Sequence, residues 1–98
     1  MRIIAGKYKG RTLESFSGDA VRPTSDRARE ALFSCLQFEI EGKKFLDAFC
    51  GSGAVGIEAL SRGAKETLFI DAARDSAEIT KKNLNKLNIT ARVLNTDC

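Results

Sequence analysis

The sequence predicts an α/β fold in which a partial parallel sheet, in β-α-β-α-β order, follows an N-terminal β-hairpin and a helix. Two observations predict it. From residue 43 onward, short apolar runs alternate with segments of helical periodicity, a pattern typical of right-handed βαβ units. In addition, glycines spaced as G-x-G-x-x-G follow the first apolar run and open a helical segment, which makes the expected fold Rossmann-like.

The N-terminal region, residues 1–42, is expected to pack on this core. Its first part, MRIIAGKYKGRTLESF, predicts two short strands joined by the turn-prone KYKG. A helix can begin at Thr24 or Ser25, because either residue is a good N-cap. The apolar stripe expected on this helix comprises Ala28, Ala31, Leu32, Cys35 and Leu36.

The second region, residues 43–98, supplies the expected parallel sheet. Strands are predicted at KFLDAF, TLFIDA and ARVL. The helix AVGIEALSR follows the glycines and can end at Gly63, while Asp75 or Ser76 can cap the next helix. Its expected apolar positions include Ala77, Ile79, Leu84 and Leu87.

Composition excludes several classes of function. The 98 residues are 43% hydrophobic and 30% charged, as in ordinary soluble domains. No apolar run suits a membrane span or a signal peptide, so we expect a cytoplasmic protein. The chain has no histidine and no C-x-x-C, so we expect neither a metal site nor histidine catalysis. Cys35, Cys50 and Cys98 are expected to be small buried side chains.

The first 13 residues are basic. They contain Arg2, Lys7, Lys9 and Arg11 and no acidic residue. Such a cluster suits a polyanion, for example the RNA backbone. It is equally typical of an edge strand kept soluble by lysines.

The glycine loop indicates an adenosine-containing cofactor. Gly51, Gly53 and Gly56 let the backbone approach a ligand closely, and Asp71 stands 20 residues after Gly51, where a carboxylate accepts hydrogen bonds from ribose hydroxyls. Asp97, just after the third predicted strand, is placed to accept a hydrogen bond from an adenine amino group.

Asp47 distinguishes between cofactors. It stands four residues before Gly51, where its charge would be unfavourable beside a pyrophosphate. S-adenosylmethionine has no phosphate and carries an ammonium group that Asp47 can pair with. Asp47 could instead serve a purely structural role by accepting hydrogen bonds from loop amides.

The segments MRIIAGKYKGRTL, RPTSDRAREALF and FLDAFCGSGAVGIEALSRGA closely resemble the N-terminal half of the RsmD family of bacterial 16S ribosomal RNA guanine methyltransferases. The resemblance implies a class I methyltransferase core that binds S-adenosylmethionine and methylates a guanine exocyclic amine. It implies cofactor roles for Asp47, Gly51, Gly53, Asp71 and Asp97, and it places Arg22, Pro23, Thr24 and Arg27 beside the methionine end of the cofactor. The N-terminal cations, with Arg22 added, would contact 16S ribosomal RNA or the small-subunit particle.

One family feature is missing from these 98 residues. Such enzymes carry an Asn/Asp-Pro-Pro-aromatic tetrapeptide that receives the target amine, whereas this chain contains one proline, Pro23. We therefore expect a cofactor-binding fragment that ends before the catalytic tetrapeptide, contains no catalytic residue and is inactive alone. A sheet that ends at its first strand also predicts self-association through that exposed edge.

Three alternatives stay open at the level of sequence. An NAD-type oxidoreductase domain would account for the glycines and Asp71, but it makes Asp47 awkward. A non-enzymatic RNA-binding module would use only the basic patch. A DNA amine methyltransferase would share the cofactor loop and differ in its target.

Overall fold

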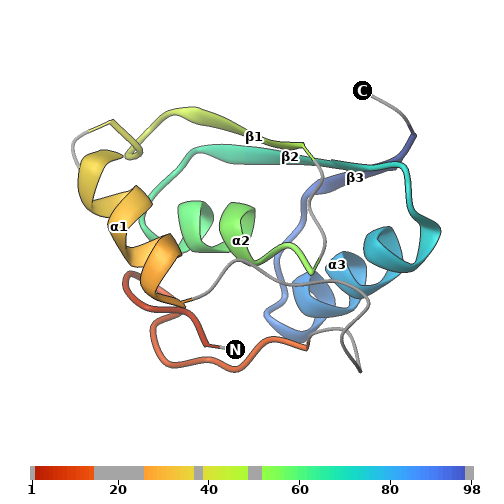
Figure 1. Cartoon of the computed structure of the whole chain (residues 1–98), viewed down its shortest axis with the longest axis horizontal. Helices are drawn as coiled ribbons and strands as arrows, with labels where there is room; N and C mark the ends of the chain where they lie inside the picture. The colour runs from red at the N-terminus through yellow and green to blue at the C-terminus, as the bar shows by residue number, and fades with distance from the viewer. Residues whose placement is uncertain (1, 15–25, 37–38, 49–51, 97–98) are drawn as a thin grey trace.

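A parallel sheet of three strands lies at the centre of the structure (Figure 1). The computed structural model describes residues 2–14, 26–36, 39–48 and 52–96. The strands are β1 (Lys44–Ala48), β2 (Glu66–Asp71) and β3 (Arg92–Asn95). They lie in the order β1-β2-β3, and both neighbouring pairs are parallel.

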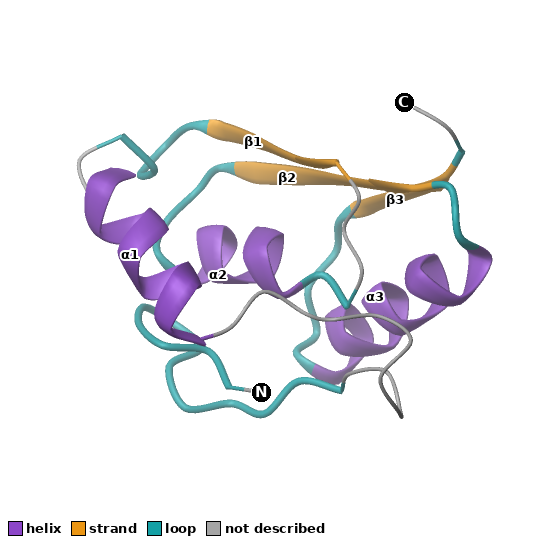
Figure 2. Cartoon of the chain, in the orientation of Figure 1, coloured by secondary structure: helices purple, strands orange, loops and turns teal. Residues whose placement is uncertain are grey.

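The helices in the described part of the chain lie on one side of this sheet, as Figure 2 shows. They are α1 (Asp26–Leu36), α2 (Ala54–Ser61) and α3 (Arg74–Lys86). Because α2 connects β1 to β2 and α3 connects β2 to β3, the chain follows the predicted β-α-β-α-β order. The prediction of an α/β fold with a parallel sheet is confirmed.

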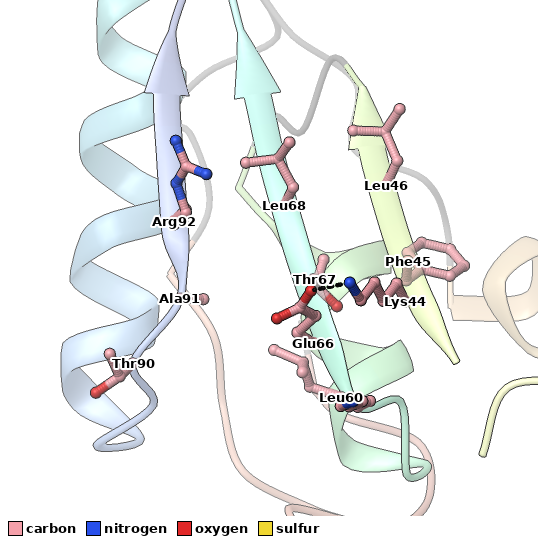
Figure 3. Close-up of a pocket in the computed structure, with 11 residues that line it drawn as sticks. Lys44, Phe45, Leu46, Leu60, Glu66, Thr67, Leu68, Thr90, Ala91 and Arg92 are labelled. Carbon is pink, nitrogen blue, oxygen red and sulfur yellow. Dashed lines mark ion pairs between the residues drawn. The ribbon is translucent and has the colours of Figure 1, made fainter. Parts of the chain in front are cut away.

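The opposite face of the sheet has no helix of the described residues over it. Leu46 pairs with Leu68, which pairs with Arg92, and Figure 3 shows these three side chains next to one another on that face. Lys44 and Glu66 form an ion pair of 3.4 Å on the same face. Leu46 is consequently 58% exposed, an unusual state for a leucine in a parallel sheet.

The main core lies between the sheet and the helices. Ile57 of α2 and Phe69 of β2 are fully buried there, together with Ile3 and Leu84. A Cβ atom on Gly56 would lie 2.3 Å from the Phe69 ring, so only glycine lets α2 approach β2 this closely. The third glycine of the motif is therefore explained by helix packing.

The N-terminal segment, defined as residues 2–14, reverses direction but forms less β structure than predicted. Arg2 and Thr12 make a single antiparallel bridge, and the described residues of this segment form no regular strand. The reason lies in the partners of its amides. The amides of Ile4 and Ala5 donate to the Glu58 carboxylate at 2.8 and 3.1 Å. These amides therefore bond to α2 and not to a second strand.

The apolar stripe predicted on α1 is confirmed at Leu36, which packs against the core, and is wrong at Ala31, Leu32 and Cys35, which are exposed. Phe33, outside that stripe, is fully buried, whereas Leu32 is 41% exposed. The Phe33 ring packs 6.2 Å from that of Phe45 and lies under the Arg62 guanidinium. An aromatic ring buries more area than a cysteine or leucine, so it decides which face turns inward. The expected burial of Cys50 and Cys98 lies outside the described residues.

The predicted cap of α3 is also wrong. The helix begins at Arg74, so Asp75 lies in its first turn and the N-cap position is Ala73, which makes no side-chain capping bond. The amide of Ala73 instead donates to Oδ1 of Asp71 at 2.8 Å. The predicted apolar positions fit better, since Ala77, Leu84 and Leu87 are buried and Ile79 is partly buried.

Candidate cofactor-binding site

The loop between β1 and α2 has the backbone that the glycine motif requires. Gly53 has a φ of 83°, in the left-handed region that side chains disfavour, and it occupies the N-cap position of α2. A Cβ atom there would also lie 2.9 Å from Cγ2 of Thr80. Both conformation and space therefore require glycine at position 53. Gly51 lies outside the described residues.

Asp47 of β1 is joined by a hydrogen bond to α2, the helix that follows this loop. It is 8% exposed, and its Oδ2 accepts a hydrogen bond from the amide of Gly56 at 3.0 Å. The structural role considered for Asp47 is thus present for one of its two oxygens. The other, Oδ1, accepts no hydrogen bond from any described residue. The carboxylate therefore keeps one buried acceptor for a further partner.

Burial makes the charge of Asp47 costly. It raises the pKa of the carboxyl group to about 6, against a lowering by the Gly56 amide and a smaller increase from the charge of Asp71. A nearby cation would relieve this cost, whereas a second anion would add to it. The site therefore favours a positively charged group beside Asp47.

Asp71 lies at the carboxyl end of the neighbouring strand. Asp47 pairs with Phe69 in the register, so Asp47 and Asp71, which is two residues beyond Phe69, point to the same face of the sheet. The backbone oxygen of Asp71 accepts bonds of 3.1 Å from the Thr96 amide and from Nδ2 of Asn95. These bonds fix the end of β2 and hold Asp71 at the edge where ligands of open α/β sheets bind.

Sequence reasoning missed Asn95. Its Nδ2 bonds the backbone oxygens of Asp71 and Ala72, at 3.1 and 3.0 Å, so it ties the end of β3 to the turn after β2. An asparagine directly after the predicted strand ARVL was the available signal, because such residues often hydrogen-bond nearby backbone.

A row of buried polar side chains on α3 was missed as well. Ser76, Thr80 and Asn83 are 5%, 0% and 0% exposed and lie on one face of the helix at helical spacing. Nδ2 of Asn83 donates to the backbone oxygen of Ser52, in the glycine loop, at 2.8 Å. Asn83 therefore attaches the glycine loop to α3. The spacing of the three polar residues beside Ala77 and Leu84 could have indicated that they are buried.

Several predicted site residues are not placed by the structure. Gly51, Arg22, Thr24 and Asp97 lie outside the described residues, and of Arg27 only the helical backbone is described. Of the predicted cofactor residues, the structure therefore brings together Asp47, Gly53 and Asp71.

The cations of the N-terminal segment are exposed. Lys7, Lys9 and Arg11 all have exposed side chains. Nη2 of Arg11 donates to the backbone oxygen of Lys86 at 3.3 Å, and Nζ of Lys7 lies 5.5 Å from the centre of the Tyr8 ring. These contacts hold the cations loosely and leave their charge available to an anionic partner.

The hollow drawn in Figure 3 lies elsewhere. It is lined by residues at the amino ends of the three strands, among them Lys44, Glu66 and Arg92, whereas Asp47 and Asp71 stand toward the carboxyl ends. Within the described ranges, no cluster of His, Cys, Asp or Glu could hold a metal ion. The same ranges contain no helix with the length and apolarity needed to cross a membrane.

The fold of this chain indicates its class, because a similar βαβαβ fold occurs in methyltransferases of known structure. One is the tRNA (uracil-54, C5)-methyltransferase of Pyrococcus abyssi, whose structure was solved in complex with S-adenosyl-L-homocysteine. The two proteins are 25% identical and superpose with a TM-score of 0.55, over 67% of this chain and 17% of the Pyrococcus abyssi chain.

The whole chain, residues 1–98, matches the family described as conserved hypothetical protein 95, and it belongs to that family. The ribosomal RNA small subunit methyltransferase D of Escherichia coli K12 is 43% identical over 98 residues, which are 99% of this chain and 50% of that protein. The solved structure of yhhF from Escherichia coli superposes with a TM-score of 0.87 at 41% identity, over 99% of this chain and 52% of its own. The resemblance to the RsmD family is thereby confirmed. The chain spans about half the length of the relatives it matches.

Proposed function

We propose that this chain is the S-adenosylmethionine-binding part of an enzyme that methylates the exocyclic amine of a guanine in 16S ribosomal RNA. The observation that carries the proposal is the buried Asp47 carboxylate, which has one oxygen without a partner among the described residues and a pKa raised to about 6. Such a group accepts a cation and disfavours a phosphate. The name of the Escherichia coli relative supports ribosomal RNA of the small subunit as the substrate.

The residues present fit this cofactor. Asp47 would pair with its ammonium group, and Asp71 would accept hydrogen bonds from its ribose hydroxyls. Gly51 and Gly53 would let the loop lie against it, because neither presents a side chain. Asp97 would accept a hydrogen bond from the adenine amino group. By family resemblance, Thr24 and Arg27 would lie beside the methionine end.

When bound, the cofactor supplies the methyl group on a sulfonium, so the protein's task is to hold donor and acceptor in line. The residues of this chain would orient the cofactor and keep water from the buried side of Asp47. We assign no catalytic residue to the chain, because the acceptor tetrapeptide of the family is not among its 98 residues. Methyl transfer by this chain alone is therefore not expected.

The RNA partner would bind through Lys7, Lys9, Arg11 and Arg22. Exposed cations on a segment without acids up to residue 13 attract phosphates over several ångströms. Either free 16S ribosomal RNA or the small-subunit particle fits this description, and both would place the enzyme in the cytoplasm.

Isothermal titration of the folded chain with S-adenosylmethionine, and separately with NAD, tests the proposal. Binding of the first and not the second is expected, and Asp47→Asn should weaken it while the circular dichroism spectrum stays unchanged. Tighter binding of NAD would favour the oxidoreductase alternative. A folded chain that binds RNA but neither cofactor would be an RNA-binding module, and the proposed function would be wrong.

A further inference from the structure

Asn83 connects two parts of the molecule that are far apart in sequence. Its side chain is fully buried on α3, although a side-chain amide is costly to bury without partners. Oδ1 accepts a hydrogen bond from the amide of Glu14 at 2.7 Å, and Nδ2 donates to the backbone oxygen of Glu14 at 3.0 Å. Nδ2 also donates to the backbone oxygen of Ser52 at 2.8 Å.

These bonds join the N-terminal segment to the glycine loop through one side chain. Glu14 is the last residue of the N-terminal segment, and Ser52 precedes Gly53 in the loop. The groups of Glu14 and Ser52 that bond Asn83 belong to the backbone, so replacing the side chain of either residue would leave these groups in place. Both hydrogens of the amide nitrogen are used, one for each segment. Displacing either segment would leave a buried polar group of Asn83 without its bond.

The loop depends on α3 at a second point. The Gly53 backbone passes so close to Thr80, one turn before Asn83, that a Cβ atom would lie 2.9 Å from Cγ2 of that residue. Steric contact with Thr80 limits how closely the loop can approach α3. The hydrogen bond from Asn83 holds Ser52 near the same helix. Together they fix the position of Ser52 and Gly53 relative to α3.

The other end of the N-terminal segment is held separately. Oγ of Ser61 donates to the backbone oxygen of Ala5 at 2.6 Å and accepts from the amide of Tyr8 at 3.0 Å. Glu58 accepts the amides of Ile4 and Ala5. Ser61 belongs to α2, and it makes no hydrogen bond to a described residue of the loop. The attachment of the segment at Asn83 thus includes the glycine loop, and the attachment at Ser61 does not.

We infer that Asn83 is a positioning residue that couples the N-terminal segment to the glycine loop, so that the loop keeps its cofactor-binding shape only while residues 2–14 are docked. The consequence for the cofactor rests on the proposed function, but the coupling itself does not. In that enzyme, contact between RNA and the basic N-terminal segment would change the conformation of the glycine loop.

Two variants separate this role from general stabilisation. Asn83→Asp keeps the size and the acceptor facing the Glu14 amide, but it turns an oxygen toward the backbone oxygens of Glu14 and Ser52. Ser61→Ala is the matched control, because it removes a buried polar contact to the same segment away from the loop.

Amide hydrogen exchange measures the coupling directly. The reporters are the Glu14 amide, which Asn83 holds, and the Ile57 amide, which donates to the backbone oxygen of Gly53 at 2.9 Å. In Asn83→Asp both should exchange at least about tenfold faster, as expected when a shared contact is lost. In Ser61→Ala the Tyr8 amide should exchange faster while Ile57 is unchanged. Faster exchange at Glu14 alone in Asn83→Asp would overturn the inference.

Wild-type protein provides a test that does not require the variant to fold. In native-state exchange under low denaturant, Glu14 and Ile57 should open in one event with the same denaturant dependence. Separate openings would overturn the coupling.

Cofactor titration then separates the inference from the proposed function. Asn83→Asp should bind S-adenosylmethionine at least about tenfold more weakly than wild type, and Ser61→Ala within about twofold, since only the first disturbs the loop. A folded Asn83→Asp with wild-type affinity would overturn the inference. A wild-type chain that binds no S-adenosylmethionine would count against the proposed function, while exchange would still decide the coupling.

Discussion

Oδ2 of Asp47 lies 3.0 Å from the amide nitrogen of Gly56 and accepts its hydrogen. This bond links the end of β1 to the first turn of α2, at the glycine that the Phe69 ring requires. One carboxylate oxygen therefore has a structural role while the other remains available. The two roles considered for Asp47 are compatible, because a carboxylate has two oxygens to offer.

Replacing Asp47 with asparagine should stabilise the folded chain at neutral pH. An asparagine oxygen can still accept the Gly56 amide, whereas the cost of burying the charge is removed. The pKa of Asp47 rises from 3.8 to about 6 on folding, so a gain of about 1 to 3 kcal/mol at pH 7.5 is expected. Urea unfolding of both proteins at pH 5 and 7.5 would measure it.

The sign of the pH effect on this difference follows from the raised pKa. A carboxyl group that binds its proton more tightly when folded favours the folded state at low pH, and this contribution is lost as pH rises from about 4 through about 6. The advantage of Asp47→Asn should therefore be larger at pH 7.5 than at pH 5. A variant less stable than wild type at pH 7.5 would mean that the buried charge is already compensated.

Cofactor affinity should rise with pH, whereas the contribution of Asp47 to folding stability falls. Only ionised Asp47 can pair with an ammonium group, so affinity for S-adenosylmethionine should rise with pH through about 6 and level off above it. Below the pKa, the loss should approach about tenfold per pH unit, the limit for one linked proton. Titration calorimetry at pH 5, 6 and 7.5 tests this, with Asp47→Asn as the control that should lack the dependence.

The sequence was sufficient to place Asp47, Gly53 and Asp71 at one edge of the sheet, because strand ends and glycine spacing are local features. It was not sufficient for α1, where Phe33 and Leu32 lie on different faces. Which of these faces turned inward depended on Phe45 and other residues from distant parts of the chain.

The contacts of the N-terminal segment were also beyond sequence reasoning. Glu58 is fully buried, yet glutamates in helices are ordinarily exposed, and its partners Ile4 and Ala5 lie more than 50 residues away. Asn83 likewise bonds Glu14 across 69 positions. Periodicity shows which face of a helix is polar, but it does not show which backbone groups will meet that face.

Asp71→Ala should weaken binding of S-adenosylmethionine by about 1 to 3 kcal/mol, the usual cost of leaving hydrogen-bonding groups unpaired. Because Oδ1 of Asp71 also accepts the Ala73 amide, a moderate loss of thermal stability should accompany it. Asp75→Ala, at an exposed acid in the first turn of α3, is the matched control and should leave affinity unchanged. Equal affinities for the two variants, both folded, would remove Asp71 from the site.

Replacing Lys7, Lys9 and Arg11 together with alanine should reduce the salt dependence of RNA binding. Each lost phosphate contact lowers the slope of log affinity against log salt by about 0.7 to 0.9, so a decrease of about 2 to 3 is expected. Cofactor affinity should stay the same. The experiment is fluorescence titration of a 16S ribosomal RNA fragment at several salt concentrations.

A charge-matched control makes this result specific to the N-terminal segment. The three lysines Lys65, Lys81 and Lys82 are also exposed but lie outside that segment. Their replacement with alanine should change the slope by less than the N-terminal replacement does. Equal changes for both triple variants would mean that the RNA responds to net charge alone, and the N-terminal cations would then have only a solubilising role.

The open face of the sheet should cause this chain to self-associate. Leu46 is 58% exposed on β1, an edge strand of the described sheet, and Leu68 lies beside it on the same face. Apolar side chains next to an unpaired strand edge favour pairing with another copy.

Sedimentation velocity over a range of concentrations should show oligomers of the wild type, and Leu46→Glu should shift them toward monomer. Leu32→Glu is the control, because that leucine is 41% exposed on α1, away from the sheet. If both variants, or neither, dissociate the oligomers, association does not involve this face.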